Sequence, residues 1–256
     1  MNIDVLFDLF FADASFEDRL SRIAAAGFKG VETWKGGDAD ELKTVGRACR
    51  DNGLTLVSVV LNGPGDQAVA PIRADACAAF LERIDAYSDN ALAAGCTAGI
   101  VTTGNRLGGQ DYYEQKQHLI DALVQASRMA EKKGFLLNLE PLNDKVDHPG
   151  YFLTSREEAV DIARQVNSPH LRILYDFYHQ QVMTGDHLAF VLSNIDWIGH
   201  FHAAGVPGRH EVFDGELAYS QIVRRLDDVQ YNGWLGLEYK PTLDDKRSLE
   251  ESLRHL

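Results

Sequence analysis

The chain has 256 residues, close to the roughly 250 residues of a typical closed α/β barrel. Hydrophobic residues make up 45% of the composition, which is enough for a large buried core, and the formal net charge is −13. An acidic chain with no basic face is atypical of nucleic-acid binders, so no nucleic-acid partner is expected.

Short apolar runs alternate with amphipathic stretches along the whole chain. The apolar runs are rich in β-branched or aromatic residues, as is typical of strands. The expected strands span about residues 3–7, 30–34, 54–61, 99–103, 135–140, 171–176, 197–202 and 234–239.

Helical patterns fill the intervals between these runs. Glycines that follow a helical run and indicate its end occur at Gly27, Gly95 and Gly134. Residues that indicate a helix start are Ser15, Ser155, Asp186 and Asp244, the last opening a helix that runs to about Leu256.

Eight βα units favour a parallel sheet with helices outside it. The count of eight and the chain length predict a single (β/α)8 TIM barrel over residues 1–256 rather than a doubly wound open sheet. No GxGxxG follows the first strand, which weakens a nucleotide-binding alternative. Two long loops, residues 62–70 and 143–152, follow strands and therefore belong to the catalytic end of such a barrel.

The cysteines and the N-terminus indicate the cellular context. Cys49, Cys77 and Cys96 are odd in number and form no CxxC pair, so buried free thiols in a reducing compartment are expected. The N-terminus, MNIDVLFDLFF, lacks the basic segment of a signal peptide, and no apolar run approaches the roughly 20 residues of a membrane span. These features predict a cytoplasmic protein with no membrane partner.

The late strands all end on side chains that can bind a metal. LLNLE ends at Glu140, RILYD at Asp176, IGHFH at His202 and WLGLE at Glu238. Taken singly, each carboxylate reads as a helix cap and the histidine as a core residue. In a barrel, however, the carboxyl ends of the strands meet at one mouth, and converging carboxylates without a cation would repel one another. The set therefore predicts one divalent metal, Mn²⁺ or Mg²⁺, with Zn²⁺ or Co²⁺ as alternatives.

Other polar residues follow the same strands. His179 lies in DFYHQQ, and Arg209 lies in the loop HAAGVPGRHE. A cation in an acidic mouth suggests an anionic substrate, and Arg209 is the candidate to bind it, a surface ion pair being the alternative. Strand alternation would point Lys240 the same way as Glu238, to contact substrate or to neutralise a carboxylate. For Glu32 in the second strand, a structural hydrogen bond to neighbouring backbone is expected.

Several motifs carry a resemblance to a known group of proteins. They are AAAGFKGVETW at 24–34, LEPLN at 139–143, HPGYFLT at 148–154, YDFYHQQ at 175–181, HFHAAGVPGRHE at 200–211 and GLEYKP at 236–241. With these motifs the chain resembles the xylose-isomerase-like TIM-barrel sugar isomerase/epimerase superfamily, and within it the hydroxypyruvate isomerase family.

The resemblance assigns roles to the residues above. It implies that Glu140, Asp176, His202 and Glu238 bind the metal, that Glu140 and Glu238 are the acid/base pair, and that His179 and Arg209 contact substrate. Some hydroxypyruvate isomerases carry Gln where His202 stands. A second glutamate of the ketose 3-epimerases would fall near Val146, where this chain has none. A homo-oligomer is left open.

The reaction implied is the interconversion of hydroxypyruvate and tartronate semialdehyde, by carboxylate-mediated proton transfer through an enediolate. It needs no redox cofactor, because the hydrogen moves within one small molecule. A ketose 3-epimerase acting on free sugars is the alternative. More remote are a metal hydrolase like the apurinic endonucleases, which would need more histidine ligands, and a non-catalytic barrel.

Overall fold

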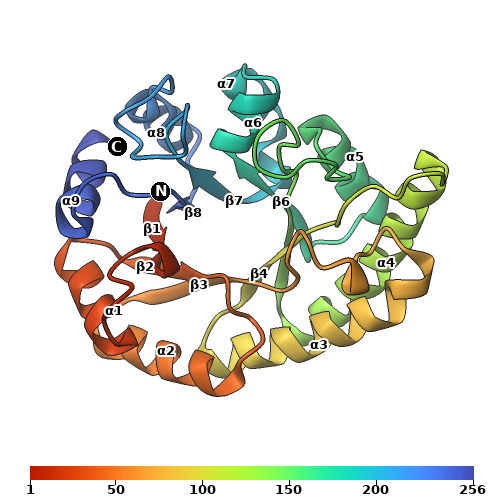
Figure 1. Ribbon diagram of the computed structural model, residues 1–256, viewed down its shortest axis with the longest axis horizontal. Coiled ribbons are helices and arrows are strands. Elements are labelled where there is room, and N and C mark those ends of the chain that lie inside the picture. Colours follow the sequence, from red (N-terminus) through yellow and green to blue (C-terminus); the bar gives the residue numbers. More distant parts are fainter.

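The computed structural model describes residues 1–256, and eight parallel strands form a closed barrel in sequence order (Figure 1). The strands are β1 (Asn2–Leu6), β2 (Gly30–Thr33), β3 (Thr55–Val60), β4 (Ala98–Val101), β5 (Leu136–Leu139), β6 (Leu171–Asp176), β7 (Ile198–Ala203) and β8 (Trp234–Leu237). Pairing of β1 with β8 closes the barrel, and the TIM-barrel fold expected from the sequence is confirmed.

Helices surround the strands (Figure 1). They are α1 (Phe16–Ala25), α2 (Ala39–Asp51), α3 (Cys77–Ala94), α4 (Tyr112–Lys133), α5 (Arg156–Val166), α6 (Phe177–Met183), α7 (His187–Asn194), α8 (Tyr219–Asp228) and α9 (Asp245–His255). The expected boundaries hold where caps set them. The Ser15 side chain accepts the backbone N–H of Asp18, and Gly95 and Gly134 end their helices in the left-handed conformation.

Helix α6 was not expected from the sequence. It follows β6 with no intervening loop, and it is too short for an apolar period to be visible. Asp176, the last residue of β6, starts it by accepting the backbone N–H groups of Tyr178 and His179. Six strands also end one or two residues earlier than predicted, with the largest differences in β4, which ends at Val101, and β8, which ends at Leu237.

The interior of the barrel is partly polar. Asp4, Glu32 and His202 are buried there around Gly236 of β8. A Cβ at Gly236 would lie 2.0 Å from Glu32 Oε1 and 2.9 Å from Asp4 Oδ1, so no larger residue fits while these carboxylates keep their places. The apolar core, a cluster of 60 buried residues, includes side chains of both the strands and the surrounding helices.

All three cysteines are free thiols, as predicted, but only Cys49 and Cys96 are buried. Cys77 is partly exposed because it occupies the first turn of α3, which corrects the expectation that all three are buried. None of the helices combines the length and the apolar character that crossing a membrane would require.

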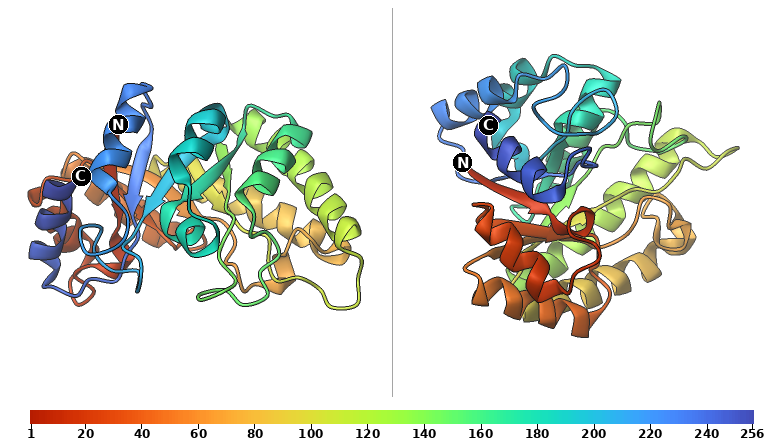
Figure 2. Two further views of the ribbon diagram at one scale, coloured as in Figure 1. Left: turned by 90° about the horizontal axis from the view of Figure 1, so that it is seen from above. Right: turned by 60° about the vertical axis from the view of Figure 1, so that its left-hand side comes forward.

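The long loops lie at the carboxyl end of the barrel, along the lower edge of the left view in Figure 2. The loop after β4 and the loop after β5 are joined by backbone hydrogen bonds. The N–H of Arg106 donates to the carbonyl of Gly150, and that of Phe152 donates to Gly104. Tethering two loops to each other in this way holds the rim of the mouth in one arrangement.

Candidate active site

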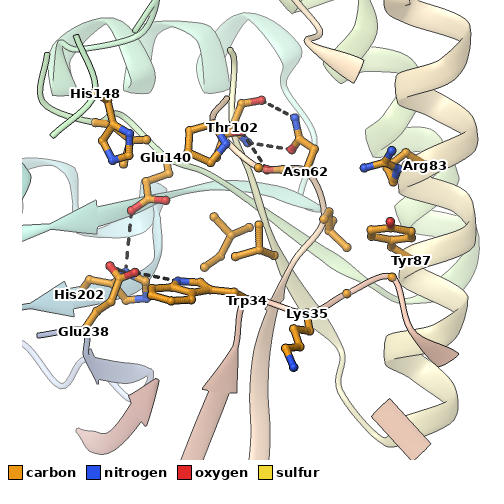
Figure 3. Close-up of a pocket in the computed structure, with 18 of the residues that line it drawn as sticks. Trp34, Lys35, Asn62, Arg83, Tyr87, Thr102, Glu140, His148, His202 and Glu238 are labelled. Atoms are coloured by element: carbon orange, nitrogen blue, oxygen red, sulfur yellow. Dashed lines mark hydrogen bonds and ion pairs between the residues drawn. The ribbon is translucent and has the colours of Figure 1, made fainter. Parts of the chain in front are cut away.

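Four side chains from successive strands meet at the mouth of the barrel. Glu140, Asp176, His202 and Glu238 are all buried, and each offers one ligand atom within 4.8 Å of the others. Figure 3 shows three of them, Glu140, His202 and Glu238, on one wall of a cavity. The convergence expected from the strand ends is therefore present.

Backbone pairing carries the two glutamates to this point. Glu140 follows β5, and its N–H donates to the carbonyl of Val101 at the end of β4. Glu238 follows β8, and its N–H donates to Ala203 at the end of β7. The ladder therefore continues one residue past each strand, and both carboxylates are held by barrel backbone rather than by loop.

The two carboxylate oxygens of Asp176 have different partners, one in helix α6 and the other in the cluster. Oδ1 accepts the two N–H groups that start α6. Oδ2 lies 3.5 Å from His179 Nε2 and 4.0 Å from Arg209 Nη2. The helix cap thus fixes the rotamer that presents Oδ2 to the cluster.

Glu238 contacts Trp34, Arg209 and His202. Its Oε1 accepts the indole N–H of Trp34 at 3.0 Å, and its Oε2 lies 2.5 Å from the Arg209 guanidinium and 3.2 Å from His202 Nδ1. Trp34 directly follows β2, is 47% exposed and lines the cavity. Sequence analysis missed Trp34, although its place after a strand was the available signal.

The carboxylates have pKa values shifted in opposite directions. Burial, with Glu238 and Asp176 nearby, raises the pKa of Glu140 to about 8. Burial likewise raises the pKa of Asp176 to about 6, against the opposing charges of Arg209 and His202. For Glu238, burial is outweighed by Arg209 and His202, and its pKa is lowered. Without a cation, the cluster therefore holds a proton that a cation would displace.

The residues present fit a divalent metal. His202 Nδ1 is buried and has no hydrogen-bond partner, yet it lies 3.2 Å from Glu238 Oε2 and 3.8 Å from Glu140 Oε1. Ligands that bind one cation at roughly 2.0–2.6 Å are about 3–4 Å apart when adjacent, so these separations are compatible with a common ion. Three carboxylates and one imidazole are the donor set of an oxygen-preferring cation.

His179 is fully buried beside this cluster. Its Nδ1 lies 3.2 Å from the backbone nitrogen of Asn143 and 2.7 Å from the amide nitrogen of the same residue. Because those groups donate, Nδ1 is an acceptor and the ring proton is on Nε2, which has no hydrogen-bond partner. Burial and Arg209 lower the pKa of His179 well below its usual value, so the ring is neutral.

Arg209 and Lys240 differ in their placement. Arg209 contacts Glu238 and lies over the Tyr178 ring, and its Nε is buried without a partner. Lys240 is exposed and does not line the cavity. The last hydrogen bond of the β7–β8 ladder comes from the N–H of Glu238, so the alternation that would have turned Lys240 toward the mouth does not extend to it.

The cavity in front of the cluster has a volume of about 600 Å³. Its inner wall carries Glu140, His202 and Glu238, and across from them lie Arg83 and Tyr87 of α3 (Figure 3). A space of this size belongs to the range of small-molecule sites.

Comparison with known proteins agrees with this architecture. Residues 20–256 match the family model of the xylose isomerase-like TIM barrel. The chain is 33% identical to the 2-oxo-tetronate isomerase of Pectobacterium atrosepticum over 91% of its own length and 89% of the relative's. It is 31% identical to the hydroxypyruvate isomerase of Escherichia coli over 91% of both chains.

A solved structure is also similar over nearly the whole chain. The crystal structure of a family 2 AP endonuclease from Brucella melitensis superimposes with a TM-score of 0.89 at 29% identity, covering 99% of each chain. The family resemblance read from the motifs is confirmed by the matched family model and the curated relatives. The chain therefore belongs to the xylose isomerase-like TIM barrel family, within it to the group of hydroxypyruvate and 2-oxo-tetronate isomerases, and it is an isomerase.

Proposed function

We propose that the chain is a metal-dependent aldose–ketose isomerase that interconverts hydroxypyruvate and tartronate semialdehyde or a closely related hydroxy-keto acid. The observation that carries the proposal is the convergence of Glu140, Asp176, His202 and Glu238 to within 4.8 Å of one another at the barrel mouth. The two curated relatives named above support the substrate class, because each is named for a small hydroxy-keto acid.

The four converging residues would hold one divalent cation, Mn²⁺ or Mg²⁺. The preponderance of oxygen ligands favours these ions over Zn²⁺ or Co²⁺. Bound there, a cation would supply Lewis-acid stabilisation to a substrate with adjacent carbonyl and hydroxyl oxygens.

Glu140 and Glu238 are the proposed acid/base pair. One carboxylate takes the proton from the carbon that bears the hydroxyl, which gives an enediolate. The hydroxyl proton then passes to the former carbonyl oxygen, and a proton is delivered to the former carbonyl carbon. Glu238, whose pKa is lowered by Arg209 and His202, is the proposed acceptor of that proton, and Glu140 is its proposed partner. The indole N–H of Trp34 would hold Glu238 in the orientation for this transfer.

His179 and Arg209 are the proposed anchors of the substrate carboxylate. His179 Nε2 and Arg209 Nε are both buried N–H groups without a partner, beside a cavity that both residues line. An unpaired buried donor costs about 1–3 kcal/mol, and an oxygen of the substrate would remove that cost. The neutral state of His179 lets it donate this hydrogen bond without adding a charge.

Replacement of Arg209 by methionine is expected to lower kcat/KM by roughly 10²–10³-fold, because removing one partner of a buried charge pair costs about 2–5 kcal/mol. The loss has two sources, namely the substrate carboxylate and the uncompensated Glu238. Steady-state kinetics on the purified variant measure it. Lys240→Met is the comparison: its exposure predicts a much smaller loss, and equal losses would contradict the assignment of Arg209.

A substrate panel tests the proposal as a whole. The metal-loaded enzyme is offered hydroxypyruvate, four-carbon 2-oxo acids, free pentuloses and hexuloses, and an abasic-site oligonucleotide as a negative arm. Turnover of the hydroxy-keto acids alone is expected. The cavity of about 600 Å³ also admits the four-carbon acids. Preference for the free ketoses would instead support a 3-epimerase. That result is not expected, because the second glutamate of the ketose 3-epimerases would fall near Val146, which is 63% exposed and does not line the cavity.

A further inference from the structure

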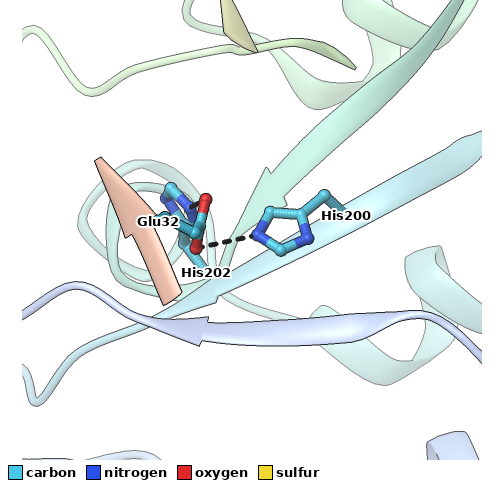
Figure 4. Close-up of side chains that lie close together, drawn as sticks. All are labelled: Glu32, His200 and His202. Carbon is cyan, nitrogen blue, oxygen red and sulfur yellow. Dashed lines mark hydrogen bonds and ion pairs between the residues drawn. The ribbon is translucent and has the colours of Figure 1, made fainter. Parts of the chain in front are cut away.

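Glu32 of β2 binds two histidines inside the barrel. It is 1% exposed, its Oε1 lies 3.0 Å from His200 Nε2, and its Oε2 lies 3.2 Å from His202 Nε2 (Figure 4). Both histidines belong to β7 and are two residues apart, so they project from the same face of the strand. Each oxygen of the Glu32 carboxylate therefore contacts one imidazole. His202 contacts both Glu32 and the other members of the four-residue cluster.

This contact determines which nitrogen of His202 carries the proton. An ionised carboxylate only accepts hydrogen bonds, so the ring nitrogen that faces Glu32 must be protonated. Each oxygen of Glu32 lies within hydrogen-bond distance of the Nε2 of one histidine, which is the geometry of a carboxylate that accepts from both rings. With the proton on Nε2, the lone pair of a neutral His202 is on Nδ1, the atom that faces Glu238 and Glu140.

We propose that Glu32 is a positioning residue, which holds His202 in the Nε2–H tautomer and thereby sets the affinity of the cluster for a divalent metal. The inference rests on the proposed metal site. Histidines that bind metals commonly donate their other ring N–H to a carboxylate, and loss of that carboxylate typically costs 10–100-fold in metal affinity. His202 has this arrangement, because its Nε2 contacts Glu32 Oε2 and its Nδ1 faces Glu238 in the cluster.

Hydrogen bonds and the space beside Gly236 hold Glu32 in its position inside the barrel. A buried carboxylate is costly unless it is hydrogen-bonded, and the N–H groups of His200 and His202 supply those bonds. Gly236 provides the space, because a Cβ there would lie 2.0 Å from Glu32 Oε1 and 3.0 Å from His202 Cδ2. Glu32, His202 and Gly236 come from three different strands, so the arrangement is part of the closed barrel and not of a loop.

Glu32→Gln is the direct test. The amide oxygen can accept from one histidine, but the amide NH₂ then meets the other and needs an acceptor there. If the amide NH₂ faces His202, it needs the lone pair of Nε2, so the ring proton moves to Nδ1 and the lone pair that would bind the metal is lost. The dissociation constant for Mn²⁺, measured on metal-free protein by calorimetry and by electron paramagnetic resonance of free Mn²⁺, is expected to rise 10–100-fold. This readout does not depend on turnover.

Glu211→Gln is the matched control. Glu211 is also 1% exposed and accepts hydrogen bonds from Thr242, Leu243 and Ser248, but it touches none of the four converging residues. It is expected to lose stability and keep the wild-type affinity for Mn²⁺. An equal loss of affinity in both variants, or none in Glu32→Gln, would overturn the role of Glu32.

Nitrogen-15 spectra of the histidine rings in the Mg²⁺-loaded wild type provide a second measurement that needs no folded Glu32 variant. The His202 signals, assigned by their loss in His202→Gln, are expected to show a protonated Nε2 and an unprotonated Nδ1. The opposite tautomer overturns the proposal. Absence of Mn²⁺ binding by the wild type would overturn the metal site together with it, whereas wild-type binding with the wrong tautomer overturns the role of Glu32 alone.

Discussion

Glu140→Gln and Glu238→Gln are each expected to lower kcat by about 10²–10⁴-fold, the usual contribution of a positioned acid or base. Glutamine keeps the shape of the side chain but cannot exchange a proton in the reaction. The two variants should differ in stability. Glu238 pairs with Arg209 and accepts the indole N–H of Trp34, so its replacement leaves two partly buried donors with weaker partners, whereas Glu140 has no such side-chain hydrogen bonds.

Single-turnover kinetics at saturating metal separate a loss of chemistry from a loss of metal. Glu158→Gln serves as the control, because it removes one carboxylate charge from α5 at a position outside the cavity. Circular dichroism checks that the barrel is intact. Near wild-type turnover in both Glu140→Gln and Glu238→Gln would remove the acid/base assignment.

Removal of the metal is expected to abolish turnover and to lower the melting temperature. The buried carboxylates of Glu140, Asp176 and Glu238 repel one another, and a cation relieves that repulsion only in the folded chain. At a metal concentration of about 100 times Kd, the stabilisation is about 2.7 kcal/mol. For a chain of this size, that corresponds to a rise in Tm of roughly 5–10 °C.

Calorimetry of the chelator-treated protein, before and after addition of Mn²⁺ or Mg²⁺, measures this rise. Asp176→Asn should show a reduced response, because the amide retains the Oδ1 cap on α6 but weakens the ligand. Full turnover after chelation, with no change in Tm on adding either ion, would contradict a metal at these residues.

The parts of the molecule that follow a local rule were predictable from the sequence. Strand positions follow from apolar runs bounded by glycine stops, and closure of eight such units brings the strand ends together. Glu140, Asp176, His202 and Glu238 were therefore identifiable as a converging set from their places at the ends of four strands. Arg209 was identifiable because a cation in an acidic mouth is unusual.

Contacts between distant segments were not predictable in the same way. Trp34 and Glu238 are 204 residues apart, and nothing in either neighbourhood indicates their hydrogen bond. The two histidines that bind Glu32 are 168 and 170 residues away from it in the sequence, so the expectation of a hydrogen bond to neighbouring backbone was wrong. Lys240 was assigned to the site by alternation, which requires a ladder that has already ended at Glu238.

The direct passage from β6 into α6 has a consequence for how such an enzyme can change its specificity. Asp176 and His179 sit on one helical turn that begins where the strand stops, so neither can shift without the other, and no loop exists there to absorb an insertion. Arg209 instead stands on a connection of 15 residues between Ala203 and Tyr219. Divergence toward new substrates is thus expected to proceed by remodelling that connection, while the β6–α6 junction is inherited intact.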